Sequence, residues 1–286
     1  MDGRGPVVAR VVRARTVAFV IVRNKWPPLR FALTPLSTII GHLDELLAPS
    51  RWADYSPNGL QVPGPAMIEH VVTGVSAHAE LFERAAAARA DLVLVHHGLF
   101  WKGEPLGIDR VRRRRLGLLF EHDMALAAYH LPLDAHLVHG NNARLAAALG
   151  AMSWEPAFAH GGAPIGVAAS FGADGIAPTD LLARVRSATY RPDVVAFLDG
   201  PDRIRSIGIC SGAAADDLPA AIDLGLDAFL TGEPAERCMA IAREYRIHFL
   251  AAGHHATERL GVQRLGELLA AEFGVGHEFV DVPNPI

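Results

Sequence analysis

Five histidine and acidic residues lie at the ends of apolar segments of this sequence or close to them. They are His96, His97, Asp134, His254 and Glu258. Three imidazoles and two carboxylates form a mixed nitrogen and oxygen ligand set, which suits zinc, iron, manganese, cobalt or nickel and disfavours calcium or copper(I). Five ligands exceed the four of one tetrahedral ion but suffice for two ions that share a carboxylate. The sequence therefore predicts two divalent metal ions per chain.

The elements expected around these residues can bring them together. His96 and His97 end a strongly apolar run that predicts a buried strand. Neighbouring strand residues point to opposite faces, but where the backbone turns at a strand end both rings can reach two ions lying side by side. Asp134 follows the next predicted strand. His254 and Glu258 are four residues apart at a predicted helix start, so both can lie on one face.

The order of strands and helices repeats in the two halves of the chain. Strands are expected over 71–75, 92–95 and 125–129, and again over 204–209, 228–230 and 248–252. The pair His130 and Asp134 falls in the first half where His254 and Glu258 fall in the second. We therefore expect an α/β fold of two similar, intertwined three-layer lobes produced by an internal duplication, with the metal site between them.

The predicted boundaries follow from this repeat. The first lobe is expected over 34–150 and the second over 151–250, with 251–286 completing the metal site and returning to the first lobe. We also expect a helix that is capped by Thr34 or Ser37 and ends at residue 47, followed by a loop over 50–64. Further helices are expected over 79–90, 109–121, 216–224 and 234–245, and another begins at 141. The segment 161–199 is expected to form a strand, a helix and a strand, and a last helix runs from 258 to about 273.

Residues 1–33 differ in composition from the rest of the chain. They hold six arginines, one lysine and a single acid, Asp2. The apolar run at 17–22 is too short to span a bilayer, and Trp26 and two prolines follow it. A secretory signal fits poorly because no small-residue cleavage site follows, and an organellar presequence fits poorly because serine is absent. The interpretation is a tail outside the fold, or a start codon placed too far upstream.

Composition limits the remaining classes of function. The 286 residues are 50% hydrophobic and carry a net charge of −4, which indicates a soluble globular protein. That charge argues against a nucleic-acid partner or an anionic membrane surface. Cys210 and Cys238 lie far apart and form no CxxC pair, so a reducing compartment, the cytoplasm, is expected. The four arginines at 112–115 predict a solvated helix face, which could touch a neighbouring subunit.

Several motifs resemble those of the Nif-three-like family, also labelled GTP cyclohydrolase 1 type 2 or dinuclear metal centre protein. They are NGLQV at 58–62, HHGLFW at 96–101, YHLPLDAH at 129–136, TGE at 231–233, GHHATER at 253–259 and PNP at 283–285. The resemblance runs from about Thr34 to the C-terminus, and the chain is similar to the short bacterial form. It implies that His97 and Asp134 bind one metal, that His96 and His254 bind the other, and that Glu258 bridges them.

The resemblance also carries the functional hypotheses. It implies a ring-like homo-hexamer and hydrolytic opening of the guanine ring of GTP. The first hypothesis is a metal-dependent hydrolase acting on a nucleotide or purine-like small molecule, with His130 as the catalytic candidate beside the metals. The alternative is a metal-binding regulatory or interaction protein without turnover. His136, His139 and His255 are expected to bind no metal.

Overall fold

The computed structural model describes residues 31–160 and 162–286, of which Phe31–Ile286 form one compact unit. The predicted tail therefore lies outside the described residues, apart from its last three positions. The backbone N–H of Ala32 donates a hydrogen bond to the carbonyl of Gly274 at 2.9 Å. Contacts within the compact unit thus begin before Thr34.

The first sheet has five strands in the order β13-β4-β5-β6-β2. Strands β13, β4, β5 and β6 are parallel neighbours, and β2 runs antiparallel to β6. The strands of this sheet are β2 (Gly59–Val62), β4 (His70–Ser76), β5 (Leu92–His97), β6 (Ala125–Ala128) and β13 (Gly276–Phe279). A separate two-stranded ribbon pairs β1 (Thr34–Pro35) with β3 (Met67–Ile68).

The second sheet repeats the central pattern of the first. Its order is β7-β8-β10-β11-β12-β9, in which β10, β11 and β12 are parallel and β9 is antiparallel to β12. Its strands are β7 (Ser153–His160), β8 (Ala163–Ser170), β9 (Val195–Leu198), β10 (Ser206–Ile209), β11 (Ala228–Thr231) and β12 (His248–Ala251). The match of β4-β5-β6-β2 to β10-β11-β12-β9 confirms the predicted duplication.

Helices cover both faces of each sheet, so each lobe has three layers. The helices are α1 (Leu36–Leu47), α2 (Ala79–Ala87), α3 (Arg110–Glu121), α4 (Leu131–Ala135), α5 (Asn141–Ala148), α6 (Pro178–Thr189), α7 (Leu218–Asp223), α8 (Cys238–Tyr245), α9 (His254–Thr257) and α10 (Arg259–Phe273), with 3₁₀ turns η1 (Pro49–Arg51) and η2 (Ala215–Asp217). In the first lobe α1 and α10 share one core and α2 and α3 the other. In the second lobe α5 and α6 correspond to the first pair and α7 and α8 to the second.

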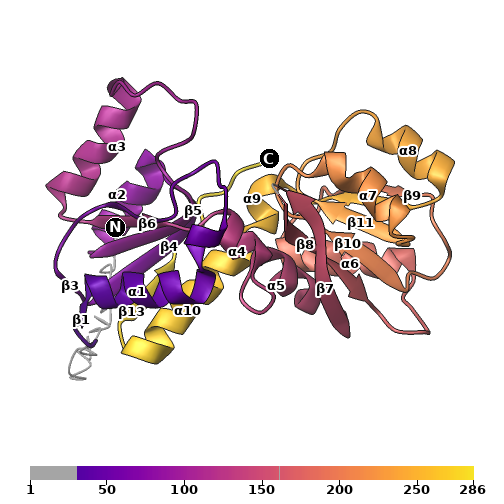
Figure 1. Ribbon diagram of the computed structural model, residues 1–286, viewed down its shortest axis with the longest axis horizontal. Helices are drawn as coiled ribbons and strands as arrows, with labels where there is room; N and C mark the ends of the chain where they lie inside the picture. The colour runs from indigo at the N-terminus through magenta and orange to yellow at the C-terminus, as the bar shows by residue number, and fades with distance from the viewer. Residues whose placement is uncertain (1–30, 161) are drawn as a thin grey trace, which may run out of the picture. The chain divides into compact units, whose positions relative to one another are not determined.

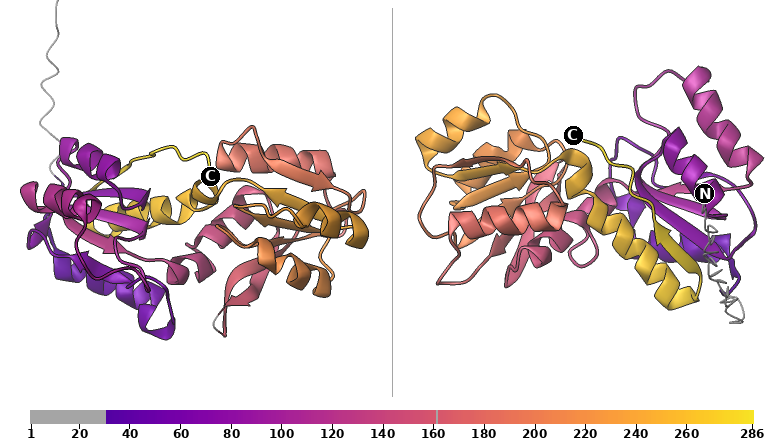
Figure 2. Two further views of the ribbon diagram at one scale, coloured as in Figure 1. Left: turned by 90° about the horizontal axis from the view of Figure 1, so that it is seen from above. Right: turned by 180° about the vertical axis from the view of Figure 1, so that it is seen from behind.

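The helices that follow the third strand of each repeat cross to the opposite lobe. Helix α5 follows β6 of the first sheet but packs on β8 and β10 of the second. Helix α10 follows β12 of the second sheet but packs on β4, β5 and β13 of the first. The yellow α10 and β13 therefore lie with the indigo and violet elements (Figures 1 and 2). This exchange confirms that the lobes are intertwined.

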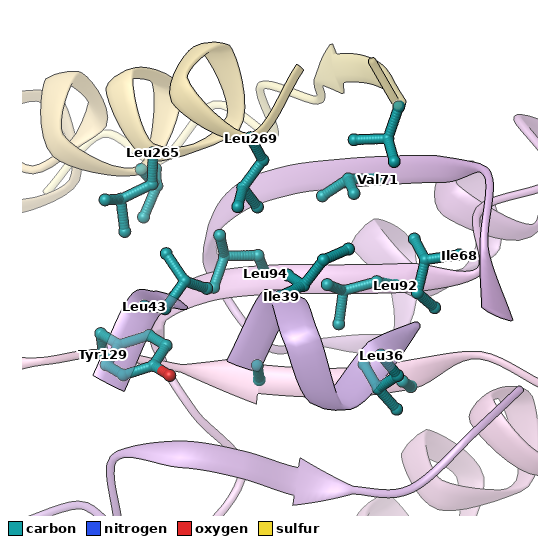
Figure 3. Close-up of a cluster of buried hydrophobic side chains, with 14 of the residues drawn as sticks. Leu36, Ile39, Leu43, Ile68, Val71, Leu92, Leu94, Tyr129, Leu265 and Leu269 are labelled. Carbon is teal, nitrogen blue, oxygen red and sulfur yellow. The ribbon is translucent and has the colours of Figure 1, made fainter. Parts of the chain in front are cut away.

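Apolar side chains of the two crossing segments fix this arrangement. Leu265 and Leu269 of α10 point from the helix toward Val71 and Leu94 of the sheet, with Leu43 of α1 close by (Figure 3). All five are fully buried. Close packing of leucines at this spacing is what the 3.6-residue period of an amphipathic helix provides.

Some element boundaries differ from the sequence prediction. The N-cap of α1 is Pro35 and makes no side-chain hydrogen bond, because Thr34 is taken up by strand pairing with Ile68. The expected loop at 50–64 contains β2, a short strand with a register shift against β6. Helix α2 ends at Ala87, and Arg89 takes a left-handed φ of 56°. Strands β7 and β13 were not predicted, and α8 begins at Cys238 instead of residue 234.

Among the described residues, no helix combines the length and apolar character needed to cross a membrane.

The crossing of α10 can be tested by truncating a core leucine. Leu265→Ala should lower the free energy of unfolding by about 2–5 kcal/mol, because it removes a fully buried side chain and leaves a cavity. Urea denaturation of the metal-free protein measures this change. Leu106→Ala is the control, since Leu106 is 99% exposed and its truncation should change little. Equal stability of the two variants would contradict the assigned role of α10.

Candidate metal centre

The double histidine forms the end of β5, after four buried apolar residues. His96 is completely buried, and its Nδ1 is 3.0 Å from the carbonyl of Tyr129. In the neutral ring Nδ1 must carry the proton to donate to that carbonyl, which leaves Nε2 with a free lone pair. His97 Nδ1 is 3.0 Å from Ser76 Oγ, so its Nε2 is also directed away from this partner. Such hydrogen bonds orient histidines that bind metals.

Asp134 is held by two donors on one of its two oxygens. It lies in α4, directly after β6, and is 6% exposed. Its Oδ1 accepts hydrogen bonds from Asn141 Nδ2 at 2.8 Å and from Ser211 Oγ at 3.2 Å. Its Oδ2 lies 3.5 Å from His96 Nε2. The second oxygen is therefore available at the point toward which His96 is directed.

His254 and Glu258 come from the second half of the chain. His254 begins the short helix α9, and its Nδ1 is 2.6 Å from Glu233 Oε1. Glu258 lies between α9 and α10, is 3% exposed, and places Oε2 at 3.1 Å from His254 Nε2 and 3.2 Å from His97 Nε2. Its Oε1 is 3.6 Å from His96 Nε2. One carboxylate thus faces all three imidazoles.

Gly212 leaves the space that Glu258 needs. Gly212 has a φ of 67°, and a Cβ at this position would lie only 2.4 Å from Glu258 Oε1. A side chain would therefore be strained by the backbone conformation and would also displace the carboxylate. The glycine turn after β10 therefore forms one wall of the histidine and carboxylate cluster.

Three overlapping groups of three residues at this point could each hold a metal ion, with candidate ligand atoms lying within 4.8 Å of one another in each group. Two of them share Glu258: one is His96, Asp134 and Glu258, and the other is His97, His254 and Glu258. The third is His96, His97 and His130. The predicted residues are thus brought together around a shared Glu258. The pairing is different from the one that the resemblance implied, because His96, not His97, lies against Asp134. Although His96 and His97 are adjacent, their ring centroids lie only 4.6 Å apart, so both rings reach the same cluster at the end of the strand.

The unpaired atoms fit a cation. His96 Nε2 and Glu258 Oε2 are buried and have no hydrogen-bond partner of adequate geometry in the part of the chain that the structure describes. Leaving such atoms unsatisfied costs about 1–3 kcal/mol each, and more for a charged group. A divalent ion coordinated by the imidazoles and carboxylates would satisfy them, and the donor set suits a first-row transition metal. The cluster can therefore hold metal.

Protonation of the cluster follows from burial and from neighbouring charges. Burial lowers the pKa of His96, but the carboxylates of Asp134 and Glu258 outweigh it and raise the pKa to about 9. Burial also opposes protonation of His254, but the neighbouring carboxylates of Glu258 and Glu233 outweigh it and raise the pKa of His254 to about 9. Burial lowers the pKa of His97 to about 3. Although burial favours the neutral acid, the surrounding imidazoles hold the pKa of Glu258 well below its ordinary value.

His130 lies beside the cluster and is held by a carboxylate that the sequence analysis missed. Its ring centroid is 5.0 Å from that of His96 and 5.6 Å from that of His97. Its Nδ1 is 2.7 Å from Asp54 Oδ1. Burial opposes ionisation of Asp54, but the hydrogen bond from His130 lowers its pKa to about 2. The NGLQV motif could have pointed to Asp54, because its Asn58 donates a hydrogen bond to Asp54 and accepts one from the backbone N–H of His130.

Among the described residues, the other histidines of these motifs join none of the candidate metal groups. His136 and His139 stack on each other with ring centroids 5.0 Å apart. His255 Nε2 is 2.9 Å from Asp281 Oδ1. Each of these rings therefore has a side-chain partner nearby.

Fold and site together define a class: duplicated α/β proteins in which both lobes contribute to one buried cluster of histidines and carboxylates. The family model for Duf34/NIF3 (NGG1p interacting factor 3) matches residues 34–285, and the chain belongs to this family. The match confirms the resemblance found in the motifs.

Curated relatives and solved structures agree with this assignment. A protein of Pseudomonas aeruginosa named "GTP cyclohydrolase 1 type 2 homolog" is 44% identical over 250 residues, which are 87% of this chain and 98% of the relative. One of the same name from Vibrio cholerae is 42% identical over 85% of this chain and 96% of its own length. A solved structure described as protein ybgI, of unknown function, is 36% identical, covers 88% of this chain and all of its own, and has a TM-score of 0.82. The structure of TTHA1606 from Thermus thermophilus is 30% identical with the same coverage and a TM-score of 0.78.

Metal binding should release protons at neutral pH. With pKa values of about 9, His96 and His254 are protonated at pH 7 and must each lose a proton to bind a cation. Apparent affinity should therefore rise as pH increases from 7 toward 9. Calorimetry in buffers of different ionisation enthalpy should give a release approaching two protons per chain at saturation. A His136→Asn control should give the same value, and binding without proton release would refute the assigned ligands.

Proposed function

We propose that this chain is a dinuclear metal-dependent hydrolase that acts on a nucleotide or purine-like substrate. The observation that carries the proposal is that Glu258 is shared by two groups of candidate ligands, with the His130 and Asp54 pair beside them. A carboxylate shared in this way can hold two cations close together. When bound, two such ions supply Lewis acidity for hydrolysis.

His130 is the group that we assign to proton transfer. Asp54 accepts the Nδ1–H of His130, which fixes the tautomer and leaves Nε2 with a lone pair. The rings of His96, His97 and Trp101 surround the His130 ring with centroids 5.0–5.6 Å away. In this position Nε2 can accept a proton during attack on the substrate and return it to a leaving group. The pair supplies a polar group outside the proposed ligand set, which a hydrolase needs and a purely regulatory metal-binding protein does not.

A pocket beside the cluster supports an anionic substrate. Two of the proposed ligands, His97 and His254, line it together with Ser76, His78 and Arg115, and its volume is about 390 Å³. None of its lining residues is acidic. Arg112 and Arg114 of the same helix pair with Glu104 and Glu83, whereas Arg115 has no carboxylate within salt-bridge distance among the described residues.

The polar groups of this pocket are arranged to donate hydrogen bonds. His78 Nδ1 accepts from the backbone N–H of Leu81, so the neutral ring carries its proton on Nε2. If His97 held a cation through Nε2, its Nδ1–H would donate to Ser76 Oγ and leave the serine hydroxyl free to donate elsewhere. A pocket whose polar groups donate hydrogen bonds is suited to a phosphate group, because phosphate oxygens accept hydrogen bonds.

Trp101 gives a surface for a flat ring next to the same pocket. It lines that pocket and also a larger one of about 580 Å³ that includes Trp52, Asp54 and Tyr55. Bases stack on aromatic side chains with about 1–3 kcal/mol each. A substrate with a purine ring against Trp101 and a phosphate near Arg115 is consistent with the name of the relatives, GTP cyclohydrolase 1 type 2 homolog.

Replacing the shared carboxylate and His130 tests catalysis. Glu258→Gln should lose one cation, because it removes the charge that holds two together, and hydrolysis should fall with it. His130→Asn should keep the metal but reduce turnover by about 10²-fold or more, the usual scale for a lost general acid or base. The measurement is turnover of GTP and other nucleotides at matched metal content, with His139→Asn as the control.

Two results would contradict this assignment. If the unmodified protein shows no turnover above the Glu258→Gln background on any nucleotide, the chain is a metal-binding regulatory protein and not a hydrolase. If His130→Asn keeps full activity at full metal content, hydrolysis stands but His130 does not transfer the proton.

Arg115 tests the substrate class separately. Arg115→Gln should raise KM by about 10-fold or more with little change in kcat, because a charge-assisted hydrogen bond of about 1.5–3 kcal/mol is lost equally from the bound substrate and the transition state. Arg114→Gln is a matched control, since Arg114 lies next to it on α3 but pairs with Glu83. Equal KM values in both variants would rule out phosphate binding by Arg115.

A further inference from the structure

Three residues in the second lobe form another cluster of metal-binding groups. His160 is the last residue of β7, Cys210 follows β10, and Asp217 ends the 3₁₀ turn η2. Their ligand atoms all lie within 4.8 Å of one another, and His160 Nε2 is 2.9 Å from Asp217 Oδ2. The cluster shares no residue with either group around Glu258.

We propose that His160, Cys210 and Asp217 bind a single zinc ion, separate from the histidine and carboxylate centre. One thiolate, one imidazole and one carboxylate are ligands that zinc accepts, and water can take the fourth position of the tetrahedron. Zinc at bond lengths of about 2.0–2.3 Å places tetrahedral ligand atoms about 3.3–3.8 Å apart. Small side-chain rotations would bring the three atoms of this cluster to that spacing.

The side chain of Asp217 is directed to this cluster and away from its local alternative. Asp217 is the N-cap residue of α7, a position at which aspartate usually accepts hydrogen bonds from the first backbone N–H groups of the helix. Here it makes no capping bond. Its carboxylate instead meets His160 and the Cys210 thiol. Its φ of −86° and ψ of −4° are helical, so capping is not open to Asp217 and its carboxylate is free to make the tertiary contact.

Burial and access also fit a bound ion. Cys210 is 1% exposed, whereas the side chains of Asp217 and His160 are 15% and 38% exposed. An ion can therefore enter from the His160 side and be held against the buried sulfur. Binding releases the thiol proton to solvent and forms the zinc–sulfur bond, so no oxidant or reductant takes part.

Such an ion would stabilise the segment that borders the histidine and carboxylate cluster around Glu258. Cys210 is followed by Ser211, which donates to Asp134, and by Gly212, which makes room for Glu258. Zinc would tie this segment to the end of the edge strand β7. The site would therefore be structural, and its occupancy would not depend on catalysis at the other centre.

Cobalt(II) titration of the metal-stripped full-length chain tests the proposal, because a cobalt–thiolate bond gives a near-ultraviolet charge-transfer band that nitrogen and oxygen ligands do not. We expect this band with the amplitude of one thiolate-bound cobalt per chain, while cobalt at the centre around Glu258, which has no sulfur ligand, does not contribute to it. Cys210→Ser should abolish it, and His160→Gln and Asp217→Asn should weaken cobalt binding, read from the band, by at least about 10-fold. Zinc should displace the cobalt and remove the band.

Two control variants separate this site from the rest of the protein. Cys238→Ser should keep the band, since Cys238 lies on α8 outside the cluster and is the other free cysteine. Glu258→Gln should also keep it, because Glu258 belongs only to the larger centre. The zinc site is overturned if the unmodified chain shows no band at saturating cobalt, or if the band persists in Cys210→Ser. The three residues would then be only a hydrogen-bonded triad. If Cys210→Ser does not fold, unchanged cobalt affinity in both His160→Gln and Asp217→Asn overturns it equally.

Discussion

The buried negative charge of Glu258 is the constraint on which the rest of the site depends. A carboxylate that is 3% exposed needs compensating charge or hydrogen bonds, because burial of an unpaired ion is very costly. Three imidazoles face it from two different lobes, at 3.1 to 3.6 Å. Positive charge at this point, whether from protons or from metal cations, therefore holds together segments that lie far apart in the chain. Competition between protons and metal for the same nitrogen atoms follows from that geometry.

The exchange of helices between lobes is what brings these segments to one place. The chain leaves the first sheet through α4, which carries Asp134, and leaves the second through α9, which carries His254. Each crossing helix then enters the hydrophobic core of the opposite lobe, through Leu145 in one direction and Leu265 in the other. Core packing thus fixes the distance between ligands that each lobe alone could not supply. Stability of the cores and geometry of the centre are coupled for this reason.

The two proposed metal sites differ in the chemical softness of their ligand atoms. Nitrogen and oxygen donors surround Glu258, whereas Cys210 supplies a sulfur a few residues from Gly212. Thiolate favours zinc, and a mixed imidazole and carboxylate set accepts several transition metals. Zinc would therefore fix the segment from Cys210 to Asp217. The first residues of the same segment form one wall of the centre around Glu258, which accepts other transition metals.

The sequence by itself determined the class of fold, the duplication and the five residues that meet at the centre, because strand periodicity and motif order are local properties of the chain. It did not determine which histidine lies against Asp134, since the directions of adjacent rings depend on how β5 ends between two lobes. Asp54 was missed because it pairs with His130 across 76 residues. Strand β13 was missed because a run of four residues becomes a strand only by pairing with β4. Tertiary contact decided these features, because each depends on groups that the chain brings together only when it folds.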